Sequence, residues 1–162
     1  MLNAPAILRQ LTENHVEFVV VGGLAMVTHG SATITEDLDV CYARTPQNIA
    51  RLAAAVAPLN PYLRGAPPGL PFRFDAATIA AGLNFTLTTD LGPVDFLGEI
   101  GGIGGYAEVA AQSELHPVYG LPVRVLSLDA LITSKKAAAR VKDRLHLLEL
   151  MELKKLRDAA SE

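Results

Sequence analysis

The chain has 162 residues, half of them apolar, which is enough for one domain with a sizeable core. Its formal net charge of −3 at pH 7 excludes the general positive field of nucleic-acid-binding proteins, so any polynucleotide partner would need a local basic patch. The apolar runs are too short to span a membrane, and the first residues lack the basic region and apolar stretch of a signal peptide.

The cysteine content indicates the redox environment. Cys41 is the single cysteine of the sequence, so no internal disulfide can form, and we expect a reducing compartment, the cytoplasm. Free cysteine behaves as a small apolar residue, and we therefore expect the Cys41 side chain to be buried.

Helices and strands alternate in the first third of the chain. Helical spacing of apolar residues and β-branched runs predict helices over residues 2–15, 24–29 and 46–58, and strands over residues 17–21 and 37–42. Thr45 is a favoured N-cap and Pro46 a favoured first residue of the third helix.

The middle of the chain has the features of a loop followed by a hairpin. Dense prolines and glycines over residues 60–74 predict an irregular loop, and one or two helical turns follow at residues 75–80. Alternating apolar and polar residues at 84–89, and a short apolar run at 94–97, predict the two strands of a hairpin. The glycine-rich residues 98–105 are expected to form a mobile loop.

The last part of the chain is mainly helical. We expect a helix over residues 106–112, two short strands within residues 116–126, and helices over residues 127–140 and 142–158. The order of elements predicts a mixed α/β (α+β) fold in a single domain over residues 1–162. Residues 1–126 would form its core and residues 127–162 a C-terminal helical segment.

Two aspartates in an apolar segment are the most informative residues. Asp37 and Asp39 lie two positions apart, and residues i and i+2 of a strand point to the same face, so both carboxylates would project together. Leu38 and Val40 would point into the core. Two like charges on a half-buried strand are unfavourable unless a cation neutralises them. Magnesium, which is satisfied by one or two carboxylates plus phosphate oxygens, fits that role.

A third aspartate and a glycine pair extend this pattern. Asp95 lies between Val94 and Phe96 in the second hairpin strand, so its side chain lies opposite these apolar neighbours. Three carboxylates from two strands are the ligands that a two-ion phosphoryl-transfer site needs. Gly22-Gly23 precedes a predicted helix, where glycines let the backbone approach a triphosphate and the free amides point at the phosphates.

Each of these features also has an ordinary explanation. Asp37 and Asp39 can be solvated acids on an exposed strand edge, and Asp95 can be a turn residue that bonds its own backbone. Gly22-Gly23 can be an ordinary strand-to-helix turn. Their joint occurrence favours a site.

Together the residues resemble the nucleotidyltransferase superfamily that includes DNA polymerase beta. The likeness is greatest to its small bacterial members, the minimal and toxin–antitoxin-associated nucleotidyltransferases. The matching residues are Gly22-Gly23, a short helix, Gly30, Thr35, Asp37-Leu38-Asp39 and the later Asp95. Residues 131–143 also resemble the Lys-x-x-Ala-x-Arg-x-Lys-Asp helix of the small members.

The resemblance implies a mixed central sheet flanked by helices, followed by C-terminal helices. It implies that Asp37, Asp39 and Asp95 are catalytic metal ligands and that Asp95 helps to deprotonate the acceptor. The residues implied to bind the nucleotide, its phosphates or the acceptor are Gly22, Gly23, Thr35, Lys135 and Arg140.

The implied reaction is magnesium-dependent transfer of a nucleoside monophosphate from a nucleoside triphosphate to a hydroxyl acceptor, which can be RNA, a protein or a small molecule. Two Mg²⁺ ions are expected, with Mn²⁺ as the alternative. Leu24 and Thr33 depart from the family, because many members carry a hydroxyl residue and an arginine there, and both donate to phosphate. The alternative function is therefore a catalytically weak fold that acts as a regulatory, toxin or antitoxin partner, with a cognate protein or as a homodimer.

The four histidines suggest no metal site. His15, His29, His116 and His146 show no metal-ligand spacing along the sequence. For His29, at the end of a predicted helix, a hydrogen-bonding role is expected.

Overall fold

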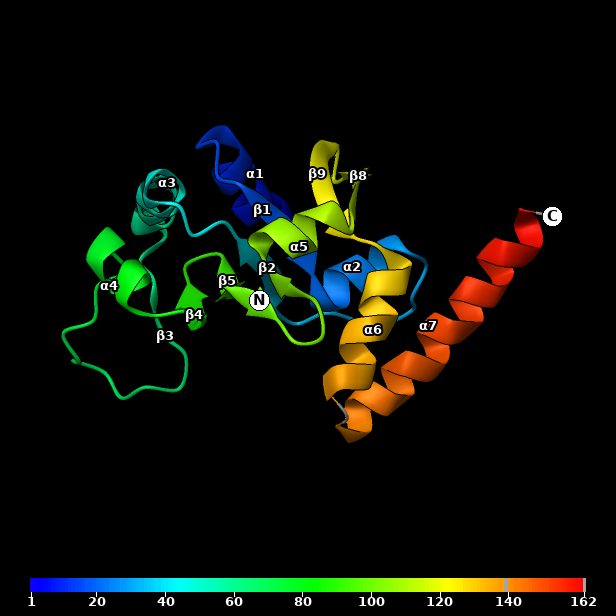
Figure 1. Ribbon diagram of the computed structural model, residues 1–162. Helices are drawn as coiled ribbons and strands as arrows, with labels where there is room; N and C mark the ends of the chain where they lie inside the picture. Colours follow the sequence, from blue (N-terminus) through cyan, green and yellow to red (C-terminus); the bar gives the residue numbers. More distant parts are fainter. Residues whose placement is uncertain (139, 162) are drawn as a thin grey trace.

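A computed structural model describes residues 1–138 and 140–161, and Figure 1 shows a central sheet flanked by helices. The helices are α1 (Ala4–Glu13), α2 (Gly22–Thr28), α3 (Pro46–Val56), α4 (Ala76–Ala81), α5 (Tyr106–Ala111), α6 (Leu128–Ala138) and α7 (Val141–Ala160), with a 3-10 turn η1 (Ala57–Leu59) after α3. The strands are β1 (Phe18–Val21), β2 (Leu38–Tyr42), β3 (Tyr62–Leu63), β4 (Phe85–Thr89), β5 (Gly92–Leu97), β6 (Glu99–Ile100), β7 (Gly104–Gly105), β8 (Ser113–Val118) and β9 (Leu121–Leu126).

Seven strands form one mixed sheet in the order β3-β4-β5-β2-β1-β9-β8. The central strand β2 is antiparallel to β1 and parallel to β5, and β1 is parallel to β9. The hairpins β4–β5 and β8–β9 form the two ends, with β3 added beyond β4. The chain therefore has the mixed α/β fold that the sequence predicted.

The core forms where the predicted apolar strands meet in the middle of this sheet. Val19 and Val20 of β1 and Leu38 and Val40 of β2 are fully buried, as expected for central strands covered on both faces. Cys41 is also buried, as predicted. In this setting burial raises the pKa of its thiol to about 12, so the thiol stays protonated at neutral pH and is a poor nucleophile.

Local sequence signals account for the helix starts around the core. Asn3 accepts a hydrogen bond from the Ala6 amide at 3.2 Å and caps α1. The predicted cap Thr45 accepts from the Asn48 amide at 3.2 Å and begins α3. These caps satisfy amides that would otherwise lack a partner at the helix start.

Several predicted boundaries differ from those of the structure. Helix α2 begins at Gly22, two positions earlier than expected, so the glycine pair forms its first turn. Residues 98–105, expected to be a loop, contain the two strands β6 and β7. Their pairing uses backbone groups of glycines, which leave no side-chain pattern in the sequence. The helix expected to end at Arg140 ends earlier, because Arg140 is the N-cap of α7; Ala139 lies outside the described residues.

Helices α6 and α7 meet in a V beside the β1–β9 part of the sheet, whereas the long loop before α4 lies at the other end (Figure 1). Leu150 of α7 is buried against the rest of the chain, but Val141, Leu145 and Leu148 are exposed. Within residues 1–138 and 140–161, no helix combines the length and apolar character needed to cross a membrane.

Candidate functional site

The three predicted aspartates meet at one point of the central sheet. The parallel register of β2 and β5 places Asp39 directly opposite Asp95, and Asp37 lies just before β2. One carboxylate oxygen from each of the three lies within 4.8 Å of the others. Strand β2 begins after Asp37, not at it, because the Thr35 hydroxyl donates to the Asp37 carbonyl at 2.6 Å and shapes the turn there.

The surroundings of Asp39 raise its pKa well above the ordinary value of a carboxyl group. Burial raises its pKa, the negative charges of Asp37 and Asp95 raise it further, and the pKa reaches about 8 in spite of the opposing charge of Lys135. A carboxyl group with such a pKa is mostly protonated at neutral pH unless a cation takes the place of the proton. Three carboxylates with no nitrogen or sulfur ligand fit a hard ion such as Mg²⁺ or Mn²⁺.

Arg64 contacts the same carboxylates, although sequence analysis did not select it. Its Nη2 lies 2.8 Å from Asp95 Oδ1, and its Nη1 lies 3.6 Å from Asp37 Oδ2. A further bond from Nη2 to the carbonyl of Leu87, at 2.8 Å, holds the guanidinium in place. Arg64 follows β3, and the pairing of Leu63 with Leu87 brings it to the site. It lies in the proline- and glycine-rich segment predicted to be a loop, where no local pattern marks this pairing.

The glycine pair makes room for the acidic residues. Gly22 has φ of +63°, and a Cβ added there would lie 2.1 Å from Asp39 Oδ2. A Cβ on Gly23 would lie 2.9 Å from the Thr35 hydroxyl oxygen. Both positions therefore need glycine because the acidic segment packs directly on the start of α2.

A groove of about 380 Å³ runs past the aspartates. It is lined by all five residues expected to bind nucleotide, by two of the aspartates and by three further titratable residues: Gly22, Gly23, Thr35, Lys135, Arg140, Asp37, Asp39, Glu36, Lys142 and His146. Burial lowers the pKa of His146, and the neighbouring charges of Lys135 and Lys142 lower it further. The groove thus has an acidic side and a basic side.

A second cavity of about 240 Å³ is also lined by Asp39, and much of its remaining lining is apolar. Leu97, Leu126 and Leu131 form part of its wall. Asp39 and Lys135 line both cavities. A ligand with one polyanionic part and one less polar part can therefore occupy both while contacting the aspartates.

A buried acid holds the two predicted basic residues in position. Asp143 is fully buried and accepts hydrogen bonds from Lys135 Nζ at 3.2 Å and from Arg140 Nε at 2.7 Å. Burial alone would raise the pKa of Asp143, but the bonds from Arg140 and Lys135 outweigh it and lower the pKa to about 2. The Arg140 amide also donates to Asp143 at 3.2 Å, which ties the basic pair to the start of α7.

Comparison with known proteins is informative at the level of structure. No known protein-family profile matches the chain, and no curated protein sequence matches it either. Similar solved structures include TM1012 of Thermotoga maritima, provisionally assigned as a nucleotidyltransferase, at 16% identity and a TM-score of 0.52, covering 99% of this chain and 96% of that one.

Two antibiotic-modifying proteins are also similar. The lincosamide antibiotic adenylyltransferase LnuA, bound to lincomycin, aligns at 13% identity and a TM-score of 0.60, over 91% of this chain and 94% of LnuA. ANT(2″)-Ia in complex with adenylyl-2″-tobramycin aligns at 18% identity and a TM-score of 0.55, over 94% of this chain and 91% of ANT(2″)-Ia. The chain therefore has the nucleotidyltransferase fold over nearly its whole length.

Proposed function

We propose that this protein is a nucleotidyltransferase that moves a nucleoside monophosphate from a nucleoside triphosphate to a hydroxyl acceptor. The observation that carries the proposal is the meeting of Asp37, Asp39 and Asp95 beside a groove with basic residues on its other side. An inert scaffold gains nothing from three neighbouring acids, because their mutual repulsion has a stability cost.

Asp37, Asp39 and Asp95 would hold Mg²⁺, or Mn²⁺ in its place. Such a two-ion centre, when bound, supplies charge neutralisation at the attacking and leaving oxygens. Asp95 would also take the proton of the acceptor hydroxyl. Before a cation binds, Arg64 supplies the positive charge that keeps Asp37 and Asp95 together.

The triphosphate would lie in the groove, with its negative charge distributed between two kinds of donor. No side chain of the N-cap Val21 caps the start of α2, and the first amides of a helix have no partner within it, so the amides of Gly22 and Gly23 would donate to phosphate oxygens. Lys135 and Arg140 face the same groove from the other side. Asp143 fixes both cations, so catalysis would depend mainly on positioning and electrostatics.

A small hydroxyl compound is the acceptor that we favour. LnuA is an antibiotic adenylyltransferase, and the ANT(2″)-Ia structure contains an adenylylated antibiotic. The net charge of −3 gives no general field that would hold a large RNA acceptor. Adenylyl transfer to an antibiotic-like alcohol is therefore the first reaction to test.

A second candidate function is a regulatory, toxin or antitoxin partner with little turnover. Leu24 is buried and has no hydroxyl to offer phosphate. The exposed apolar residues of α7, among them Val141, Leu145 and Leu148, could contact a partner protein or a second copy. Copurification of a partner together with absence of nucleotide binding would favour this function.

The test is incubation of the purified protein with Mg²⁺, labelled nucleoside triphosphates and a panel of hydroxyl acceptors. We expect labelled product from the wild type and background levels from Asp39→Asn. Glu13→Gln, which neutralises an exposed acid at the end of α1, is the matched control and should leave the activity unchanged. Equal labelling by the wild type and Asp39→Asn would overturn the proposal.

A further inference from the structure

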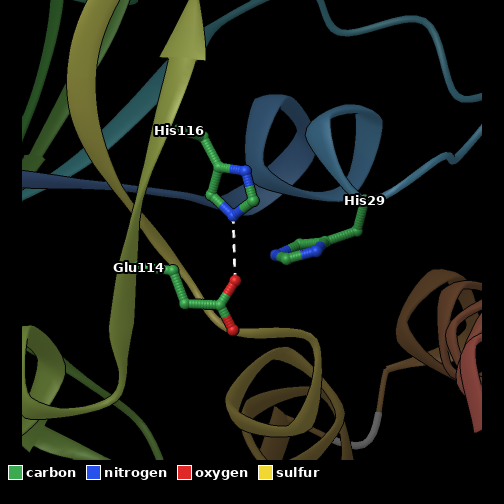
Figure 2. A group of neighbouring side chains, drawn as sticks. All are labelled: His29, Glu114 and His116. Atoms are coloured by element: carbon green, nitrogen blue, oxygen red, sulfur yellow. Dashed lines mark hydrogen bonds and ion pairs between the residues drawn. The ribbon is translucent and has the colours of Figure 1, made fainter. Parts of the chain in front are cut away.

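A second group of side chains of the types that ligate metals lies away from the aspartates. His29 directly follows α2, and Glu114 and His116 lie on β8. One ligand atom from each lies within 4.8 Å of the other two. Figure 2 shows the His29 ring beside the line that joins His116 to Glu114. These residues come from segments about half the chain apart in sequence, which is why their spacing along the chain gave no signal.

The sheet accounts for how the group forms. Glu114 and His116 are two positions apart on an edge strand, so they project from the same face, and they pair with the buried residues Val125 and Val123 of β9. His29 is held by the sheet as well, because its Nε2 lies 2.8 Å from the carbonyl of Leu126, the last residue of β9. His29 therefore has a hydrogen-bonding role, as expected, but its partner belongs to a strand and not to the end of its own helix.

The side chains are already close to the geometry of a metal centre. His116 Nε2 lies 2.9 Å from Glu114 Oε2, and the rings of His29 and His116 have centroids 5.4 Å apart at an angle of 82°. Tetrahedral bonds of ~2.0–2.1 Å place neighbouring ligand atoms about 3.4 Å apart. Small rotations of partly exposed side chains are therefore enough to enclose an ion.

We propose that His29, Glu114 and His116 form a separate binding site for a zinc-class divalent ion. Two imidazoles and one carboxylate are a ligand set that suits zinc and related transition metals, whereas the three aspartates suit a hard ion. The Glu114 side chain is 52% exposed, so a fourth coordination position is open to water. The proposal does not depend on nucleotidyl transfer.

Binding at this site would join two parts of the fold. The ion would connect the outermost strand β8 to the end of α2, the helix whose first residues, Gly22 and Gly23, line the groove. It would replace the hydrogen bond that joins His116 to Glu114. Zinc should therefore raise the melting temperature and slow the exchange of amides in the β8–β9 hairpin.

The experiment is a zinc titration against a competing chelator, with excess Mg²⁺ present to compete for the aspartates, followed by NMR of the histidine rings. We expect one tightly bound zinc ion per chain and shifted ring signals for His29 and His116. The ring signals of His15 and His146 should not move. The NMR chemical shifts of the ring nitrogens also report which nitrogen of His29 binds the ion.

Variants separate this site from other sources of zinc binding. His29→Gln, His116→Gln and the exposed Glu114→Gln should each weaken zinc binding by at least about 10- to 100-fold, the loss that even second-shell changes cause. His15→Asn and Asp39→Asn should not change it. Three results would overturn the proposal: wild-type affinity no higher than that of Glu114→Gln, zinc binding lost in Asp39→Asn, or unshifted His29 and His116 rings. Circular dichroism verifies that each variant is folded.

Discussion

At the scale of single residues, the gathering of three carboxylates changes the pKa of Asp39. Its pKa is raised from 3.8 to about 8, first by burial and then by Asp37 and Asp95. In metal-free protein between these pH values, the unfolded chain has lost a proton that the folded chain keeps. The free energy of unfolding should therefore fall as the pH rises through this window, by at most about 1.4 kcal/mol per pH unit from this residue.

Urea denaturation in EDTA, at pH values across the window, measures this dependence. The difference between wild type and Asp39→Asn isolates Asp39 from the other titrating groups. We expect the variant to lose this part of the pH dependence and to become more stable than the wild type toward pH 8. If the free energy of unfolding depended on pH in the same way in both proteins, the pKa of Asp39 would not be raised in the folded protein.

The close contact between Gly22 and Asp39 leads to a second prediction. Gly22→Ala should destabilise the protein by about 1–2 kcal/mol through its positive φ alone, and more because the new Cβ would displace Asp39 Oδ2. Gly65→Ala is the matched control, since Gly65 has φ of +80° but a Cβ added there would meet nothing within 4 Å. Denaturation and Mn²⁺ titration should show loss of ion binding in Gly22→Ala only. An equal loss of stability and of Mn²⁺ binding in Gly22→Ala and Gly65→Ala would contradict this account.

Arg64 forms ion pairs with Asp37 and Asp95, so we expect it to compete with cations for these aspartates. Arg64→Gln should weaken the metal-free protein by about 1.5–3 kcal/mol, because hydrogen bonds to charged groups are lost, and should increase Mn²⁺ affinity because a competing positive charge is removed. Arg73→Gln, an exposed change in the same loop, is the control. Calorimetric titration with Mn²⁺ and denaturation in EDTA measure the two effects. A weaker affinity for Mn²⁺ in Arg64→Gln would show that Arg64 supports ion binding instead.

At the scale of elements, the junction between α6 and α7 positions the basic side of the groove. Asp143→Asn should cost about 1.5–3 kcal/mol, because the buried carboxylate bonds both Lys135 and Arg140. Asp158→Asn, which removes an exposed ion pair with Arg157, should change stability by less than about 1 kcal/mol. Urea denaturation compares them. Similar midpoints for the two variants would mean that the junction does not depend on Asp143.

Elements with strong local patterns were predicted well from the sequence. The β-branched run of β1, the apolar spacing of α1 and the cap of α3 are local signals, and the structure has these elements near their expected bounds. Strand β3 and the pair β6–β7 were not predicted, because their pairing involves backbone groups in segments rich in proline and glycine. Local propensity does not report such pairing.

At the scale of the whole molecule, sequence analysis identified those site residues whose local sequence is unusual and missed those that tertiary pairing brings together. Asp37, Asp39 and Asp95 stand out because an acid in an apolar strand is unusual wherever the strand lies. Nothing in their local sequence distinguishes Arg64, or the group formed by His29, Glu114 and His116. Their positions became apparent only when β3 paired with β4 and when β8 lay next to the end of α2.

The central claim is that aspartates from two neighbouring strands share divalent ions next to the glycine turn. The most direct measurement is anomalous diffraction from crystals soaked with Mn²⁺ and a non-hydrolysable nucleoside triphosphate. We predict Mn²⁺ peaks bounded by Asp37, Asp39 and Asp95, with the phosphates against the amides of Gly22 and Gly23. Absence of Mn²⁺ from these carboxylates, with the Asp95 side chain turned away from Asp39, would contradict the account.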